Sequence, residues 1–180
     1  MTFEFSLDEE DYFMLNYYFT SKDPATRSRM VKSRWILLGL YLILAAILYL
    51  PGFLLADLTF IIFAGLSFIF YPFYQKWLIR KNIRNLVNQN FKEIPHQSQK
   101  VILDESEIIS ETKAGQSKYK LEQVKSIHET GKHFFIMMKT GNCFTLPKTR
   151  IEDREMLEDG IGYISEMTGI SINRELNWSW

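Results

Sequence analysis

Hydrophobic residues along this chain are concentrated in two long runs, Trp35–Leu50 and Leu58–Tyr74. A helix needs about 20 apolar residues to cross a hydrocarbon core that is about 30 Å thick. The Pro51-Gly52 pair between the runs breaks a helix, and the whole stretch has a single formal charge, Asp57. The pattern therefore predicts two transmembrane helices joined as a hairpin. Because neither run has an ionisable residue in its interior, we expect an anchor rather than an ion pathway.

Lys and Arg are unevenly distributed around this hairpin. The turn Pro51–Asp57 has none, whereas both outer flanks are basic. Cytoplasmic flanks carry the positive excess, so both termini are predicted to be cytoplasmic. The flanking cations expected to contact lipid headgroups are Arg27, Arg29, Lys32, Arg34, Lys76, Arg80, Lys81 and Arg84. The alternative is a buried helical hairpin in a soluble protein, although neither run has the polar stripe of such a helix.

The polar segments on either side of the hairpin have patterns of their own. Alternating apolar residues predict a strand over Thr2–Leu7, followed by an aromatic helix over Glu9–Thr20. A break at Ser21–Pro24 precedes a basic helix that leads into the first span. After the second span, the helix is expected to continue to about Lys92. The segments are therefore residues 1–34, the hairpin over 35–75, and a cytoplasmic helical extension over 76–94.

Residues 95–180 are predicted to form a β domain that ends with a helix. The pattern favours six strands, over Val101–Asp104, Glu107–Thr112, Ser117–Leu121, Val124–Glu129, Lys132–Lys139 and Asn142–Pro147. The helix is expected from Asp153 to Met167, with a glycine cap at Gly169. Its predicted apolar face consists of Met156, Leu157, Ile161, Ile164 and Met167. Six antiparallel strands closed by a C-terminal helix are similar to a pleckstrin-homology-like (PH-like) fold.

The chain also resembles the bacterial YcxB-like proteins. The resemblance lies in Phe5-Ser-Leu with Asp11-Tyr12, in the paired apolar spans, and in the segments Tyr119–Ile136 and Cys143–Ile151. It implies a bacterial inner-membrane protein with a PH-like domain, and it brings no catalytic residues. The expected fold class is therefore an α+β membrane protein, with a two-helix transmembrane hairpin and a PH-like antiparallel β domain.

Candidate chemistry in the β domain is sparse. If Thr130-Gly131 is a two-residue turn, His128 faces His133, and the two side chains share one sheet face. If Thr140-Gly141 is another, Cys143 faces Met138 on the opposite face. A structural zinc site needs four protein ligands, so no metal site is expected. There is no nucleophile elbow, phosphate loop or zincin motif, so we expect neither an enzyme nor a cofactor.

Three further lysines, Lys113, Lys118 and Lys120, bracket a predicted hairpin turn and are candidate lipid contacts as well. The 21 basic and 21 acidic residues balance, so no nucleic-acid partner is expected. The leading interpretation is a non-enzymatic membrane protein that presents its β domain to a protein or anionic lipid partner. The alternatives are an accessory subunit of a membrane transport or export system and, less favoured, an enzyme. Oligomeric state and the role of the Trp178–Trp180 tail are left open.

Overall fold

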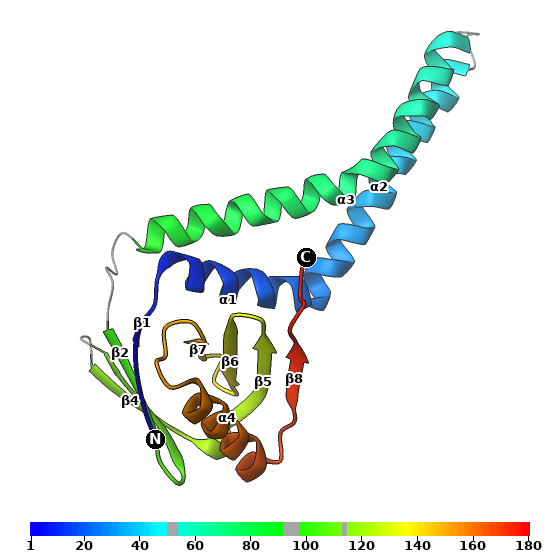
Figure 1. The fold of residues 1–180 in the computed structure, drawn as a ribbon. Coiled ribbons are helices and arrows are strands. Elements are labelled where there is room, and N and C mark those ends of the chain that lie inside the picture. Colours follow the sequence, from blue (N-terminus) through cyan, green and yellow to red (C-terminus); the bar gives the residue numbers. More distant parts are fainter. Residues whose placement is uncertain (50–53, 92–97, 113–114) are drawn as a thin grey trace. The chain divides into compact units, whose positions relative to one another are not determined.

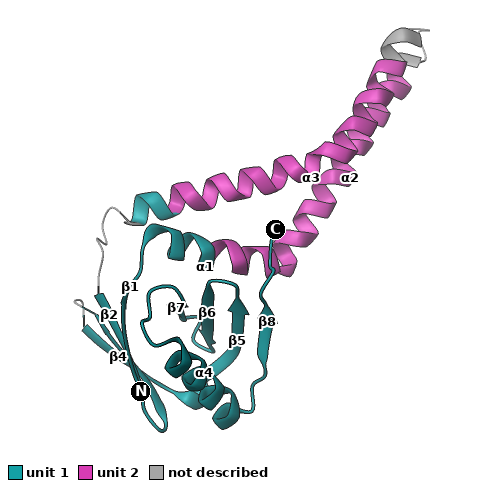
Figure 2. Ribbon diagram, in the orientation of Figure 1, with its two compact units in different colours: residues 1–15, 87–180 teal, residues 16–86 magenta. Residues whose placement is uncertain are grey.

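The computed structural model describes the chain except for residues 50–53, 92–97 and 113–114, and except for the side chains of residues 48, 49, 54–57 and 91. Contacts between residues divide the chain into two compact units (Figure 2). Unit 1 contains residues 1–15 and 87–180, and unit 2 contains residues 16–86. The N-terminal strand and the β strands thus belong together, whereas the sequence placed them in separate segments. Each unit is described by itself below.

Unit 2 is helical. It contains the C-terminal part of α1 (Glu9–Lys22), all of α2 (Pro24–Tyr49) and most of α3 (Leu54–Phe91) (Figure 1). The break predicted between α1 and α2 is confirmed. Asp23 caps α2 by accepting hydrogen bonds from the backbone N–H and the hydroxyl of Thr26, and Pro24 occupies the first helical position, where its missing N–H costs nothing.

Both long helices expose their apolar side chains. The most apolar 18-residue windows of α2 and α3 are each only 6% buried, and both helices are long and apolar enough to cross a membrane. Ile36, Phe70 and Phe73 are among the most exposed hydrophobic residues. The core helix of a soluble protein buries such residues, so this surface favours the hairpin over the soluble alternative.

Within its described residues, unit 1 contains two four-stranded sheets and one complete helix, together with the start of α1 and the end of α3. The first sheet is antiparallel, in the order β1-β2-β3-β4. Its strands are β1 (Thr2–Ser6), β2 (Ser98–Leu103), β3 (Glu107–Thr112) and β4 (Gly115–Lys120). A 3-10 turn, η1 (Leu121–Gln123), leads to the second sheet, in the order β7-β6-β5-β8. Its strands are β5 (Val124–Thr130), β6 (His133–Met138), β7 (Cys143–Pro147) and β8 (Ile172–Glu175).

The helix α4 (Arg154–Thr168) packs on the core of unit 1. Leu157, Ile161 and Ile164 are fully buried, together with apolar residues from both sheets. Asp153 caps the helix start by accepting from the N–H of Met156, and Gly169 ends the helix with φ 67°. These bounds confirm the predicted helix. The inclusion of Met167 in the apolar face is wrong, because Met167 is 58% exposed in the last turn.

Both hairpin registers predicted around the histidines and Cys143 are wrong. Strand β5 extends through Thr130, whose hydroxyl bonds the backbone of His133, so the turn is Gly131-Lys132. His128 consequently faces Phe135 and not His133. The β6–β7 turn spans four residues, closed by a bond from the Met138 N–H to the Asn142 carbonyl. Cys143 therefore faces Met137, which places it on the sheet face of His133 and not on the opposite one.

Candidate functional site

The eight basic residues predicted at the membrane surface all lie in unit 2, and the structure uses some of them internally. Arg34, on α2, donates from Nε to the backbone carbonyl of Phe68 on α3, at 2.8 Å. Its guanidinium also lies over the Phe68 ring, 3.6 Å from the centroid. Arg34 thus joins the two helices of the hairpin, a role that the sequence did not assign to it.

The carbonyl of Phe68 needs this donor because of a proline. In an α-helix, the carbonyl of one residue accepts from the N–H four residues later. For Phe68 that residue is Pro72, which lies inside α3 and has no N–H. A carbonyl that a proline frees in a membrane helix can be satisfied by a neighbouring helix, by a Ser or Thr side chain or by an ordered water. Arg34 supplies the missing donor from α2.

Neighbouring polar contacts extend this arrangement. Gln75, one turn beyond Pro72, donates to the hydroxyl of Ser33 on α2 at 2.6 Å. Arg27 also has an internal partner, because its Nε donates to the Ser21 carbonyl at the end of α1, at 2.8 Å. Arg27 and Arg34 are therefore held by the protein backbone. Through Ser33 and Arg34, α2 contacts α3 next to the apolar segments of both helices.

The remaining cations of α2 and α3 are better placed to face solvent or headgroups. Arg29, Lys32, Arg80 and Lys81 are exposed, whereas Lys76 and Arg84 are half-buried. On α3, the rings of Tyr71, Tyr74 and Trp77 stack in series with centroids 6.2 and 6.0 Å apart. The Lys81 ammonium lies 5.1 Å from the centroid of the Trp77 ring. Trp and Tyr side chains are enriched at membrane–water interfaces.

The predicted lysines of the β domain lie in unit 1. Lys118 and Lys120 are exposed on β4, the edge strand of the first sheet, where Lys120 faces Glu107 on β3. Lys113 lies outside the described residues. Lys120 also lines an open groove of about 800 Å³ at the C-terminal end of α4. Its charged lining residues are Glu105, Glu107, Lys120, Glu122, Lys125 and Lys139. Three acids and three lysines give this groove no preference for anions.

An ionic cluster that the sequence did not predict ties α1 to the β domain within unit 1. Asp11 is buried, and its carboxylate meets His133 Nε2 at 2.8 Å and Arg150 Nη1 at 2.8 Å. Arg150 also pairs with Asp8 and donates to the Ser6 carbonyl at 2.9 Å. Asp8 and Asp11 accept each other's backbone N–H at 2.9 Å, which caps the start of α1.

Charge and burial shift the pKa of Asp8 in opposite directions. Burial raises the pKa of Asp8, but the N–H of Asp11 and the Arg150 guanidinium stabilise the carboxylate and hold its pKa below the usual value. A second cluster joins Lys148 to Glu129 at 2.6 Å, and Glu129 to Arg174 of β8 at 3.1 Å. These charges are paired within unit 1, where the two clusters link α1 and β8 to neighbouring strands, and neither cluster contains a poised nucleophile.

The chemistry available in unit 1 is accordingly limited. Burial raises the pKa of the Cys143 thiol to about 12, so it is neutral at physiological pH and a poor nucleophile. Among the described residues, no group of three or more His, Cys, Asp or Glu side chains is placed to hold a metal ion. His133 and His128 have separate partners, Asp11 and Ser126.

Comparison with known proteins adds one finding. Residues 103–161 match the family model described as YcxB-like protein. No curated protein and no solved structure matches the chain. The match extends from the end of β2 into α4, and it includes the two β-domain segments on which the sequence resemblance rests. The family predicted from the sequence is therefore confirmed for this part of the chain: residues 103–161 are similar to the YcxB-like proteins.

Proposed function

We propose that this chain is a non-enzymatic integral membrane protein, whose helical hairpin anchors a PH-like domain at the cytoplasmic face of a bacterial inner membrane. The observation that carries the proposal is the exposed apolar surface of α2 and α3, whose most apolar windows are only 6% buried. Water would make such a surface prone to aggregation, and a bilayer would cover it.

The local structure of the hairpin supports an anchor rather than a channel. The Arg34 side chain satisfies the carbonyl that Pro72 leaves unpaired, as the bilayer requires of backbone groups near the hydrocarbon region. The stacked Tyr71, Tyr74 and Trp77 rings form an interfacial aromatic group beside Lys81. The positive excess on the outer flanks supports a cytoplasmic location for both termini.

The PH-like part of the proposal rests on strand order. A four-stranded antiparallel sheet is followed by three further antiparallel strands, β5 to β7, and then by a buried amphipathic helix. Strand β1, from the N-terminus, completes the first sheet, and β8 is an addition to the second. The role assigned to this domain is binding of a protein or anionic lipid, with Lys118 and Lys120 as the candidate lipid contacts.

The lipid role is tested with the full chain in two kinds of nanodisc, one of neutral phosphatidylcholine and one that contains about 30% anionic phosphatidylglycerol. Hydrogen exchange of β4 should slow in the anionic discs, and less so in the variant Lys118→Glu/Lys120→Glu. The matched control is Lys132→Glu, a reversal at an exposed turn of the same unit. Equal exchange of β4 in both lipids would reject lipid contact and leave a protein partner.

A further inference from the structure

The outer edge of strand β1 is a free hydrogen-bonding edge. Within the part of the chain that the structure describes, β1 pairs with β2 alone. Met1 and Leu103 exchange both backbone hydrogen bonds, at 2.8 Å each. Bonded pairs alternate with unbonded pairs along an antiparallel ladder, so Phe3 and Phe5 are bonded to β2. The N–H and C=O groups of Thr2, Glu4 and Ser6 must therefore point away from β2.

One contact confirms this direction. The outward carbonyl of Ser6 accepts a hydrogen bond from Arg150 Nη1 at 2.9 Å, from a residue that follows β7. Among the described residues, no protein group bonds the outward backbone groups of Thr2 or Glu4. The N–H and C=O groups of Thr2 and Glu4, two donors and two acceptors, are thus available along the edge. Edge groups of this kind are the template for addition of another strand.

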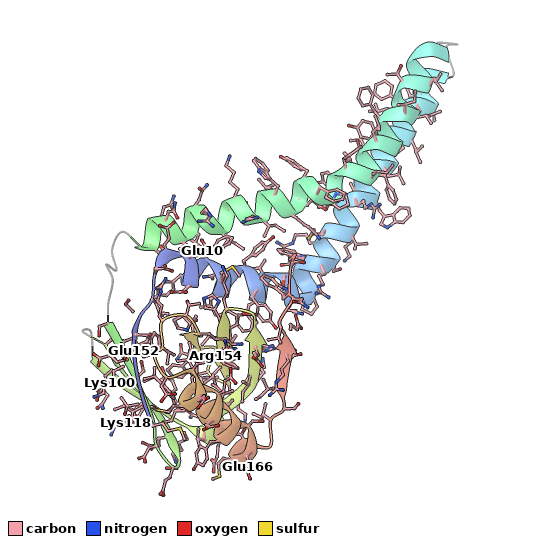
Figure 3. All side chains as sticks on the ribbon, in the orientation of Figure 1. Glu10, Lys100, Lys118, Glu152, Arg154 and Glu166 are labelled. Atoms are coloured by element: carbon pink, nitrogen blue, oxygen red, sulfur yellow. The ribbon has the colours of Figure 1, made fainter. Side chains whose placement is uncertain are left out.

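Space for another chain lies beside these groups. An open groove of about 410 Å³ is lined by Thr2, Phe3 and Glu4 on one side, and by the segment from Arg150 to Asp153 with Met156 on the other. Figure 3 labels Glu152 and Arg154 at the start of α4. The groove lies between the free edge of β1 and the start of α4, so an extended peptide in the groove would contact the unpaired backbone groups of Thr2 and Glu4.

The other sheet edges carry basic residues or proline, which discourage strand addition, whereas the one charge on β1 is the acidic Glu4. The edge strand β4 carries Lys118 and Lys120, β7 ends at Pro147, and β8 carries Arg174. Lysine, proline and inward or exposed charges are the usual protection of an edge. Strand β1, with the sequence Thr-Phe-Glu-Phe-Ser, has no basic residue or proline, and its register with β2 is regular over all five pairs.

Charge indicates which peptide fits. The acids that line the groove are Glu4, Glu152 and Asp153, all exposed. The lining cation, Arg150, is already paired with Asp8 and Asp11. Lys100 faces Glu4 across the sheet, which leaves the carboxylates of Glu152 and Asp153 as the main negative charge. We propose that the free edge of β1 binds an extended basic segment of a partner protein, which joins the first sheet as a fifth strand.

This inference rests on the proposed function and names the chemistry of the protein partner, but it uses a surface separate from the candidate lipid contacts. The test uses the full chain in neutral detergent micelles and three fluorescein-labelled decapeptides, followed by fluorescence anisotropy. The first peptide alternates lysine and valine, the second replaces lysine with glutamate, and the third is the lysine peptide with N-methyl groups on alternate residues. N-methylation removes the strand hydrogen bonds and keeps the charge.

The lysine peptide should bind saturably, the N-methylated peptide roughly tenfold more weakly, and the glutamate peptide not at all at about 1 mM. The variant Glu4→Pro removes an outward N–H that β2 does not use, so binding of the lysine peptide should weaken by roughly tenfold. Glu152→Lys should weaken it as well. The matched control is Glu166→Lys, at the other end of α4 (Figure 3), which should leave binding unchanged.

Equal affinity for the methylated and unmodified peptides would overturn strand addition, and equal affinity for the lysine and glutamate peptides would overturn the preference for a basic partner. Absence of saturable binding of the lysine peptide rejects the inference altogether. If circular dichroism shows that Glu4→Pro does not fold, the methylated peptide still tests strand addition, and Glu152→Lys still tests the preference for a basic peptide. No outcome depends on lipid, so failure here leaves the membrane anchor untouched.

Discussion

The contact of Arg34 with Phe68 gives the sharpest test of how the hairpin is built. The change is Arg34→Met, which removes the guanidinium donors and keeps an unbranched side chain of similar reach. It leaves the Phe68 carbonyl without a donor, because Pro72 has none to offer. It also removes the cation–π contact with the Phe68 ring. We expect the hairpin to be destabilised.

The magnitude follows from two contributions. A hydrogen bond to a charged group contributes about 1.5–3 kcal/mol in water, whereas side-chain hydrogen bonds in membrane proteins average about 0.6 and reach about 1.7 kcal/mol. The cation–π contact adds about 0.5–1 kcal/mol near a surface. The expected loss in the free energy of unfolding is therefore about 1–2.5 kcal/mol. Stability is measured by unfolding the full chain with sodium dodecyl sulfate in mixed micelles, followed by tryptophan fluorescence.

The proline supplies an internal control. In Pro72→Ala, the alanine N–H bonds the Phe68 carbonyl directly, so Arg34→Met should cost about 1 kcal/mol less in that background. Arg29→Met, an exposed arginine on the same helix, should change stability by less than about 0.5 kcal/mol. A coupling of zero between Arg34→Met and Pro72→Ala would refute the reasoning, and so would an equal loss in Arg29→Met.

Three further predictions concern unit 1. Because burial raises the pKa of Cys143 to about 12, the folded chain should resist iodoacetamide at pH 8 and react fully in denaturant, as measured by mass spectrometry. The chain should also lose stability as pH rises above the thiol's ordinary pKa of 9.0, and this loss should be smaller in Cys143→Ala. Because the pKa of Asp8 lies below its ordinary 3.8, the stability that its carboxylate provides is present above that value and is lost as pH falls further; unfolding between about pH 5 and 2 should show a shallower slope in Asp8→Asn. A Cβ at Gly160 would lie 2.9 Å from Leu103 Cδ1 and 3.2 Å from Phe3 Cζ, whereas one at Gly162 meets nothing within 4 Å. Gly160→Ala should therefore be less stable than Gly162→Ala by about 1 kcal/mol or more in thermal unfolding, and equal stability would contradict the packing of α4 on β1 and β2.

Local patterns in the sequence were sufficient for much of the fold. The two apolar runs, the break before Pro24, six strands of the β domain and the helix α4 with its Gly169 cap each depend on neighbouring residues, and the structure confirms them. Strand β8 was missed because its four residues include a single apolar side chain, Ile172, and its pairing with β5 is parallel and distant along the chain. Such a strand has no alternation to detect.

Registers and ion pairs depend on information that a local pattern lacks. Thr130 looks like a turn residue but continues β5, since its hydroxyl satisfies the backbone of His133. A one-residue error in the position of that turn moved the predicted partner of His128 by two residues, from Phe135 to His133. Asp11 and Arg150 are 139 residues apart, so their ion pair appears only when β1 completes the first sheet. The eight flanking cations were predicted from charge alone, which did not distinguish Arg34 from exposed Arg29.

The central claim is that α2 and α3 cross the membrane as a hairpin with both chain ends in the cytoplasm. The measurement is a pair of reporter fusions, alkaline phosphatase and green fluorescent protein, placed within residues 51–57 and at the C-terminus of the full chain. Phosphatase should be active only at residues 51–57, and green fluorescence should appear only at the C-terminus. Active phosphatase at the C-terminus, or release of the unfused chain from membranes by alkaline carbonate, would contradict the account.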